Sequence, residues 1–434
     1  MTDGRTLLHG GEPGEHSHNP VVRYFRVLGP GLVTGAADDD PSGITTYSVA
    51  GAALGYGILW TALACYPLMA AVQLVCARIG LVTGEGLAAA LRRHYPRPLL
   101  YAACLLLLVA NVFNIAADLG GMAEAAEMLS GLPRLTWIPV FGGAIVLATV
   151  YASYATFARW IKWLTAVLFA YVAAALLSRP DWWAVLWGTF VPHLELNAHS
   201  AATLVAILGT TISPYLFFWQ AAHEVEEEKA RGRHTLRQRR GATPHELADA
   251  ALDVNTGMLF SVVGMYSIML ATASTLHRTG HRDIETARQA AEALRPVAGE
   301  AAYLLYALGL IGTGLLAIPV LAGAASYAVA EVFQWPAGLS LKPWHGRRFY
   351  LVLAGAVVVG IAISLLQRSP VRVLFVSALV NGLLAPPLLA LVMLVGGNRR
   401  IMGEHANGRW LNILGWVATA VMTGAAVAFV LLGT

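Results

Sequence analysis

Three carboxylates in a row, at Asp38, Asp39 and Asp40, interrupt an apolar stretch and are followed by Pro41. Proline has no backbone N–H and disfavours helix at the preceding residue, so the carbonyls near Ala37 are expected to lose their intrahelical partners. Free carbonyls beside carboxylates form a hard, negative, oxygen-rich site, which suits a divalent cation such as Mg²⁺ or Mn²⁺ and repels an anion. Asp40 is predicted to be the principal ligand. Asp38 and Asp39 are an outer shell for a hydrated ion, charges that only widen its vestibule, or acids that cap a helix end in water.

A second break of the same kind occurs in "TTISPY", where Pro214 follows Ser213 inside another apolar stretch. Here Thr210 and Ser213 supply hydroxyls and freed carbonyls in place of charge. These hydroxyls either face the ion or bond back to their own helix, as Ser and Thr do in membrane helices. Asn381, in a later apolar stretch, either faces the site or makes an interhelical hydrogen bond.

Asn111, Asn114 and Asp118 recur at spacings of three and four residues, which places them on one face of a helix. This polar stripe either lines a water pathway or packs against the two broken segments.

The segment "HEVEEEKARGRHTLRQRR" alternates acidic and basic blocks and is predicted to be a solvated connector. Asp253 and Asn255 follow it at the expected start of the next apolar stretch, where they are predicted to be caps or gate residues.

The elements that must position these residues are membrane spans. Of the 434 residues, 57% are hydrophobic and 12% are charged, with a mean hydropathy of +0.61. Soluble domains carry about 25% charged residues, so a polytopic all-α membrane protein is indicated. A helix of about 20 apolar residues crosses a bilayer core. The apolar runs predict eleven spans, at residues 28–54, 57–80, 98–128, 135–154, 157–178, 200–222, 251–276, 301–333, 348–367, 370–397 and 410–432.

The basic residues predict the orientation. Most of the 29 Lys and Arg lie on the inner side if the N-terminus is cytoplasmic, as the positive-inside rule requires. An odd number of spans then puts the C-terminus outside. Residues 1–26 are predicted to form a cytoplasmic tail and residues 27–434 one transporter domain in the plasma (inner) membrane.

The two breaks fall in the first and the sixth expected spans, which begin five spans apart. Paired interruptions in corresponding places of two halves are typical of inverted-repeat transporters, whose discontinuous helices form a site at the membrane midplane. The repeats are predicted at about residues 28–178 and 200–397, and the span at 410–432 is an addition.

At these residues the chain resembles the Nramp family of divalent-metal transporters. The segments "GPGLVTGAADDDPSG", "LVTGEGLAAALRRHYP", "ADLGGMAEA" and "LGTTISPYLFFW" occur in the order of that family's first, second, third and sixth helix signatures. The resemblance implies a LeuT-like 5+5 inverted repeat in which helices 1 and 6 are discontinuous. It also implies that manganese or iron(II) usually moves inward together with protons.

The resemblance assigns the family's metal site residue by residue. The metal-binding carboxylate falls on Asp40, but the neighbouring amide ligand is replaced by Gly43 and the thioether ligand of the sixth helix by Ser213. The family's two carbonyl ligands and a loosely aligned glutamine of the tenth helix fall on Ala37, Thr210 and Asn381.

The proton route is also altered in this resemblance. The family's two histidines of the sixth helix become Tyr215 and Gln220, and a membrane-embedded glutamate becomes Asn111, whereas Asp118 is retained. Loss of sulfur removes discrimination against magnesium, because thioethers favour transition metals. The pattern is similar to the Nramp-related magnesium transporters, which the resemblance implies carry Mg²⁺ or Mn²⁺ without proton coupling.

The sequence therefore predicts a secondary transporter rather than an enzyme, with Mg²⁺ or Mn²⁺ as substrate and no cofactor. Its partners are the ion and the lipid bilayer; neither nucleic acid nor an obligate protein partner is expected. One alternative is a proton-coupled manganese or iron importer. Another is a cation-coupled amino-acid symporter, for which three aspartates are an unsuitable surrounding because they repel a substrate carboxylate.

Overall fold

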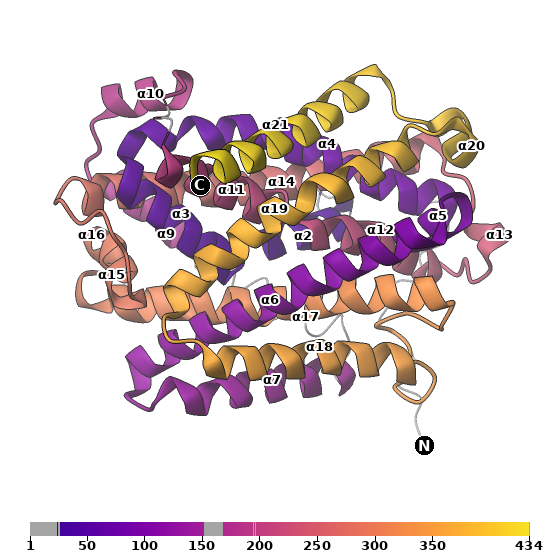
Figure 1. Ribbon diagram of the computed structural model, residues 1–434, viewed down its shortest axis with the longest axis horizontal. Coiled ribbons are helices and arrows are strands. Elements are labelled where there is room, and N and C mark those ends of the chain that lie inside the picture. The colour runs from indigo at the N-terminus through magenta and orange to yellow at the C-terminus, as the bar shows by residue number, and fades with distance from the viewer. Residues whose placement is uncertain (1–23, 25–26, 152–167, 194, 196, 434) are drawn as a thin grey trace.

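The chain folds into a bundle of helices. The computed structural model describes residues 24, 27–151, 168–193, 195 and 197–433, and over these residues it contains helices and no β-strand (Figure 1). The bundle is built from α2 (Pro30–Asp38), α3 (Pro41–Leu54), α4 (Trp60–Thr83), α6 (Arg97–Ser130), α7 (Arg134–Tyr151), α9 (Leu168–Leu177), α11 (Ala198–Thr211), α12 (Pro214–Ala230), α14 (Pro244–Thr272), α17 (Ala302–Phe333), α18 (Arg347–Leu366), α19 (Pro370–Gly396) and α21 (Arg409–Gly433). The connections hold α5 (Leu87–His94), α10 (Trp182–Phe190), α13 (Leu236–Arg239), α15 (Ala287–Ala291), α16 (Arg295–Ala298) and α20 (Arg399–Met402).

Nine spans within the described residues are long and apolar enough to cross a membrane. They are α4, α6, α7, α11 continued by α12, α14, α17, α18, α19 and α21. The first expected span is divided into α2 and α3, and the fifth, at residues 157–178, lies partly outside the described residues. The total of eleven spans therefore stays a prediction. Leucines cover the outside of the bundle, as at Leu105 (61% exposed) and Leu366 (84%), which is the surface that a lipid environment requires.

The two ends of the bundle carry different short helices. Figure 1 shows α10, α15 and α16 at one end and α5, α13 and α20 at the other. We name these the outer end and the inner end. The expected cytoplasmic side of the membrane corresponds to the inner end.

Helix α2 packs against α14 through glycines. A Cβ on Gly35 would lie 2.1 Å from the carbonyl oxygen of Gly257, and a Cβ on Gly257 would lie 2.0 Å from the carbonyl oxygen of Gly31. Real Cβ atoms do not approach so closely, so only glycine lets the two backbones meet. This contact brings α2 to the face of α14 that carries Asp253.

Asp253 caps a neighbouring helix and not its own. Its Oδ1 accepts hydrogen bonds from the amides of Gly29 (2.8 Å) and Leu32 (3.1 Å), and its Oδ2 accepts one from Gly31 (2.6 Å). The expectation that Asp253 opens its own helix is wrong, because α14 begins at Pro244, where a capping box formed with Thr243 starts the helix earlier. Its carboxylate instead satisfies the free amides at the start of α2.

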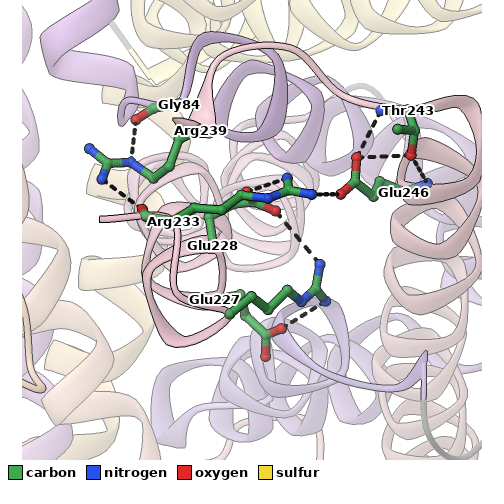
Figure 2. A network of polar contacts seen from close by, with 8 residues as sticks. Gly84, Glu227, Glu228, Arg233, Arg239, Thr243 and Glu246 are labelled. Carbon is green, nitrogen blue, oxygen red and sulfur yellow. Dashed lines mark hydrogen bonds and ion pairs between the residues drawn. The ribbon is translucent and has the colours of Figure 1, made fainter. Parts of the chain in front are cut away.

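Helix α12 continues into the charged segment that was expected to be a solvated connector. Glu224 is 5% exposed and Glu228 is 1% exposed, so that expectation is wrong for the first part of the segment. Arg233 bridges Glu228 on α12 and Glu246 on α14, at 2.6 Å to each (Figure 2). These ion pairs tie the inner ends of α12 and α14 together.

Candidate metal site

Asp40 stands at the break in the first span, where it caps α3. Its Oδ1 accepts a hydrogen bond from the amide of Gly43 at 2.6 Å, and Pro41 begins the helix. An aspartate before a proline is a favoured start of a helix, because the carboxylate satisfies a free amide and proline gives up none. The other carboxylate oxygen, Oδ2, accepts a hydrogen bond from Asn114 Nδ2 on α6 at 2.8 Å. Asp40 is 1% exposed, so α3 and α6 hold this carboxylate away from solvent.

The two predicted breaks are confirmed, and they meet. Helix α2 ends at Asp38 and α3 begins at Pro41, while α11 ends at Thr211 and α12 begins at Pro214. The Tyr215 hydroxyl at the start of α12 donates to the carbonyl oxygen of Ala37 at 2.8 Å. Four helix ends therefore surround one buried region, which is the geometry expected of paired discontinuous helices.

Gly43 and Thr210 join the two breaks on the other side of this region. A Cβ on Gly43 would lie 3.3 Å from Thr210 Oγ1 and 3.4 Å from Asp40 Oδ1. Thr210 Oγ1 is buried and makes no hydrogen bond within the described residues. Its hydroxyl oxygen thus lies close to the start of α3 without a partner among the described residues, and its role as a ligand stays a prediction.

Ser213 bonds back to its own helix. Its hydroxyl lies 2.6 Å from the carbonyl oxygen of Thr210 and 2.9 Å from that of Gly209, and it donates to one of them at a time. Of the two expected arrangements for this hydroxyl, the structure adopts the second. The oxygen of Ser213 keeps its lone pairs, as does the carbonyl oxygen of Thr210.

Asp38 and Asp39 face α14, whereas Asp40 contacts Asn114 on α6. The Ser261 hydroxyl lies 2.6 Å from Asp38 Oδ2 and 3.4 Å from Asp39 Oδ1, and a Cβ on Gly264 would lie 2.8 Å from Asp39 Oδ2. Both aspartates are 0% exposed, so the alternative that they cap a helix in water is wrong. Asp38 Oδ1 and Asp39 Oδ2 have no hydrogen-bond partner among the described residues.

The acids at the break do not form a preassembled cluster of charged ligands. Across the described residues no group of three or more His, Cys, Asp and Glu side chains is placed to hold one metal ion. Asp40 turns to α6, whereas Asp38 and Asp39 turn to α14. A cation at Asp40 would therefore take its other ligands from neutral oxygens.

The polar stripe on α6 divides into two roles. Asn111 Nδ2 donates to the carbonyl oxygen of Leu321 on α17 at 2.8 Å, which is a packing contact. Asn114 donates a hydrogen bond to Asp40. Asp118 is close enough to Asp40 for their charges to interact, and neither of its carboxylate oxygens has a hydrogen-bond partner in the described part of the chain. Asn114 was not among the predicted ligands. The sequence signal that could have indicated Asn114 was its spacing of four residues from Asp118, which places both on one face of the helix.

Asn381 lies on α19 and is 2% exposed. Its Nδ2 has no hydrogen-bond partner among the described residues, and none of their hydrogen bonds joins it to Asp40. Asn381 lies between Ala378 and Gly382 in the sequence. The backbones of Ala378 and Gly382 pack against Gly209 of α11. Its place as a ligand stays a prediction.

Buried hydrogen bonds lie on both sides of the breaks. Toward the inner end, Thr34 Oγ1 donates to Gln220 Oε1 at 2.5 Å, and Gln220 Nε2 donates to Glu224 Oε1 at 2.9 Å. Toward the outer end, the Tyr47 and Thr211 hydroxyls lie 3.0 Å apart.

Comparison with known proteins agrees with this architecture. A family model described as "Natural resistance-associated macrophage protein-like" matches residues 31–432. Proteins named divalent metal cation transporter MntH are similar over most of their length: that of Klebsiella pneumoniae (strain 342) is 27% identical over 418 residues, covering 94% of this chain and 95% of the relative. That of Pectobacterium carotovorum is 29% identical over 406 residues, covering 90% of each.

Two solved structures share the fold. The manganese transporter of Eremococcus coleocola aligns with a TM-score of 0.73 at 18% identity, covering 96% of this chain and 88% of that one. Mhp1, a nucleobase-cation-symport-1 family transporter, aligns with a TM-score of 0.57 at 15% identity, covering 93% and 92%. These neighbours confirm the expected fold class, an all-α polytopic membrane protein with LeuT-like architecture.

Proposed function

The chain belongs to the Nramp family, and from this premise we propose that it is a secondary transporter that carries divalent metal cations across the plasma membrane by alternating access. In the proposed orientation the N-terminus is cytoplasmic and the C-terminus is outside. The observation that carries the proposal is the buried Asp40 carboxylate at the meeting point of two broken helices. Its relatives named MntH are divalent metal cation transporters, which supports the same substrate class.

The chemistry of the donors favours magnesium, with manganese also accepted. Asp40 is a carboxylate, Thr210 and Ser213 carry hydroxyls, and Ala37 offers a carbonyl; none of these is a sulfur or an imidazole. Oxygen ligands suit Mg²⁺ and Mn²⁺, and small neighbours such as Gly43 leave room for the waters that Mg²⁺ retains. The carboxylates at the break have no Lys or Arg among their contacts within the described residues. Uncompensated negative charge attracts a dication and repels an amino-acid carboxylate.

We propose transport without proton coupling, because Tyr215 and Gln220 occupy the positions at which the family resemblance expects histidines. One observation favours the second candidate, a proton-coupled manganese or iron importer: Asp118 is buried, lies near Asp40 and makes no hydrogen bond of normal geometry in the described part of the chain. A carboxyl group in this position could accept a proton.

Liposome transport tests both candidates. Purified protein is reconstituted with a fluorescent pH indicator inside, and Mn²⁺ uptake is followed with and without competing Mg²⁺. Under the proposed function Mg²⁺ competes and the internal pH stays constant, whereas Asp40→Ala liposomes take up no Mn²⁺. Mn²⁺-driven acidification would overturn the uncoupled mechanism and favour the second candidate. Uptake of a labelled amino acid that survives Asp40→Ala would instead point to a symporter.

A further inference from the structure

The amide of Asn114 lies on the carboxylate that the proposed function makes the principal ligand. Asn114 is in the middle of α6, is 0% exposed, and donates from Nδ2 to Asp40 Oδ2 at 2.8 Å. Its own carbonyl oxygen, Oδ1, has no hydrogen-bond partner among the described residues. A buried amide oxygen without a partner is unfavourable and calls for an explanation, and an ion at Asp40 provides one.

Burial alone does not single out Asn114, because Asn111 Oδ1 is also without a partner in the described part of the chain. The difference lies in where the two amides point. Asn111 donates to the carbonyl oxygen of Leu321 on α17, which is a helix-to-helix contact. Asn114 donates to Asp40, so its oxygen and nitrogen both lie beside the carboxylate. Asn111 is therefore a matched control for any test of Asn114.

The start of α3 carries Gly43, which has no side chain to offer as a ligand. A Cβ on Gly43 would lie 3.2 Å from the carbonyl oxygen of Asp38, 3.3 Å from Thr210 Oγ1 and 3.4 Å from Asp40 Oδ1. The first two contacts are tighter than ordinary van der Waals packing, the third is at its lower limit, and all three are to oxygens. A longer side chain at Gly43 would enter the space in which these oxygens converge. Because α3 contains no Asn or Gln, an amide ligand beside Asp40 would come from another helix.

We propose that Asn114 is a direct ligand of the transported cation, with its Oδ1 binding the ion together with Asp40. The inference rests on the proposed function and deepens it. Rotation of the amide about its last side-chain bond, a torsion with a broad energy profile, exchanges the positions of Nδ2 and Oδ1. The hydrogen bond from Asn114 to Asp40 is then lost, and the ion is bound by Asn114 Oδ1 and Asp40 Oδ2 instead. A neutral amide oxygen beside one carboxylate is a ligand pair that Mg²⁺ and Mn²⁺ accept.

Calorimetry on the purified full-length chain tests the inference with Mn²⁺ and Mg²⁺ as the probes. Asn114→Leu removes the oxygen and is expected to raise the Mn²⁺ Kd about tenfold. Asn114→Asp keeps an oxygen ligand while removing the donor, so its Mn²⁺ Kd is expected to remain within about twofold of the parent or to fall. Asn111→Leu, the control, is expected to leave the Kd within about twofold. Size-exclusion chromatography and thermal unfolding check that each variant folds, and Asn114→Ala replaces the Leu variant if that one does not.

The outcomes separate this inference from the proposed function. If the parent protein binds neither ion, both fail. If the parent binds and Asn114→Leu binds equally well, the proposed function stands and the inference is overturned. If Asn114→Asp loses as much affinity as Asn114→Leu, Asn114 acts as a hydrogen-bond donor that positions Asp40, and its role as a ligand is overturned.

Discussion

Removing the carboxylate of Asp253 should loosen the inner end of the transporter. This side chain accepts three backbone hydrogen bonds, from Gly29, Gly31 and Leu32, and so holds the first turn of α2 against α14. Loss of a helix cap costs about 0.5–2 kcal/mol, and hydrogen bonds to a charged group are worth about 1.5–3 kcal/mol. The three bonds share one carboxylate and are not additive, so we take about 2 kcal/mol for Asp253→Ala, at the upper end of the range for caps. Since 1.4 kcal/mol is tenfold, the population with α2 detached should rise about 30-fold.

A cysteine at Thr34 reports this detachment. Thr34 is 0% exposed and bonds to Gln220 of α12, so a thiol there is reached only when α2 moves away. In a background that lacks Cys65, Cys76 and Cys104, Thr34→Cys is treated with a water-soluble maleimide in the absence of metal. The alkylation rate should follow the detached fraction and rise about 30-fold with Asp253→Ala.

The control and the refuting result come from the same helix. Asp249 lies one turn before Asp253, and its carboxylate is 3.0 Å from His245. Asp249→Ala removes an acid from α14 without touching the cap of α2, so it should leave the alkylation rate unchanged. A rate for folded Asp253→Ala within about threefold of its parent, equivalent to less than about 0.7 kcal/mol, would refute the idea that this cap holds the inner end closed.

Three further predictions concern the residues at the breaks and the packing of α2. Asp40→Ala should abolish metal uptake into liposomes while Asp38→Ala only weakens it, because Asp38 turns to α14; equal losses would contradict this order. Ser213→Met should tighten Cd²⁺ binding and weaken Mg²⁺ binding in calorimetry, because sulfur prefers soft ions; an unchanged Cd²⁺ affinity would count against this position as a ligand. Gly35→Val should lower thermal stability by about 1–3 kcal/mol through overpacking against Gly257, and a midpoint equal to the parent's would show that the contact yields easily.

The positions of both helix breaks could be predicted from the sequence because their causes are local. Pro41 and Pro214 lack an amide proton and restrict the residue before them, whatever surrounds them. The membrane class follows in the same way from hydropathy summed along the chain. Asp40 could be singled out as a ligand candidate because it lies directly at one of these breaks.

The partners of these residues were decided by the tertiary structure. Asn114 is 74 residues from Asp40, Ser261 is 223 residues from Asp38, and Asp253 caps a helix more than 200 residues away. Such contacts depend on which helix faces pack, and these follow from glycine contacts such as that between Gly35 and Gly257, which a local pattern does not encode. The same packing extends α12 into a charged segment, because Arg233 neutralises a glutamate that the sequence alone assigns to water. The amino-acid sequence by itself determined where the helices break and which carboxylate stands at the break, because these effects act within a few residues. Only the tertiary structure decided which distant side chain contacts that carboxylate, because long-range packing sets its position.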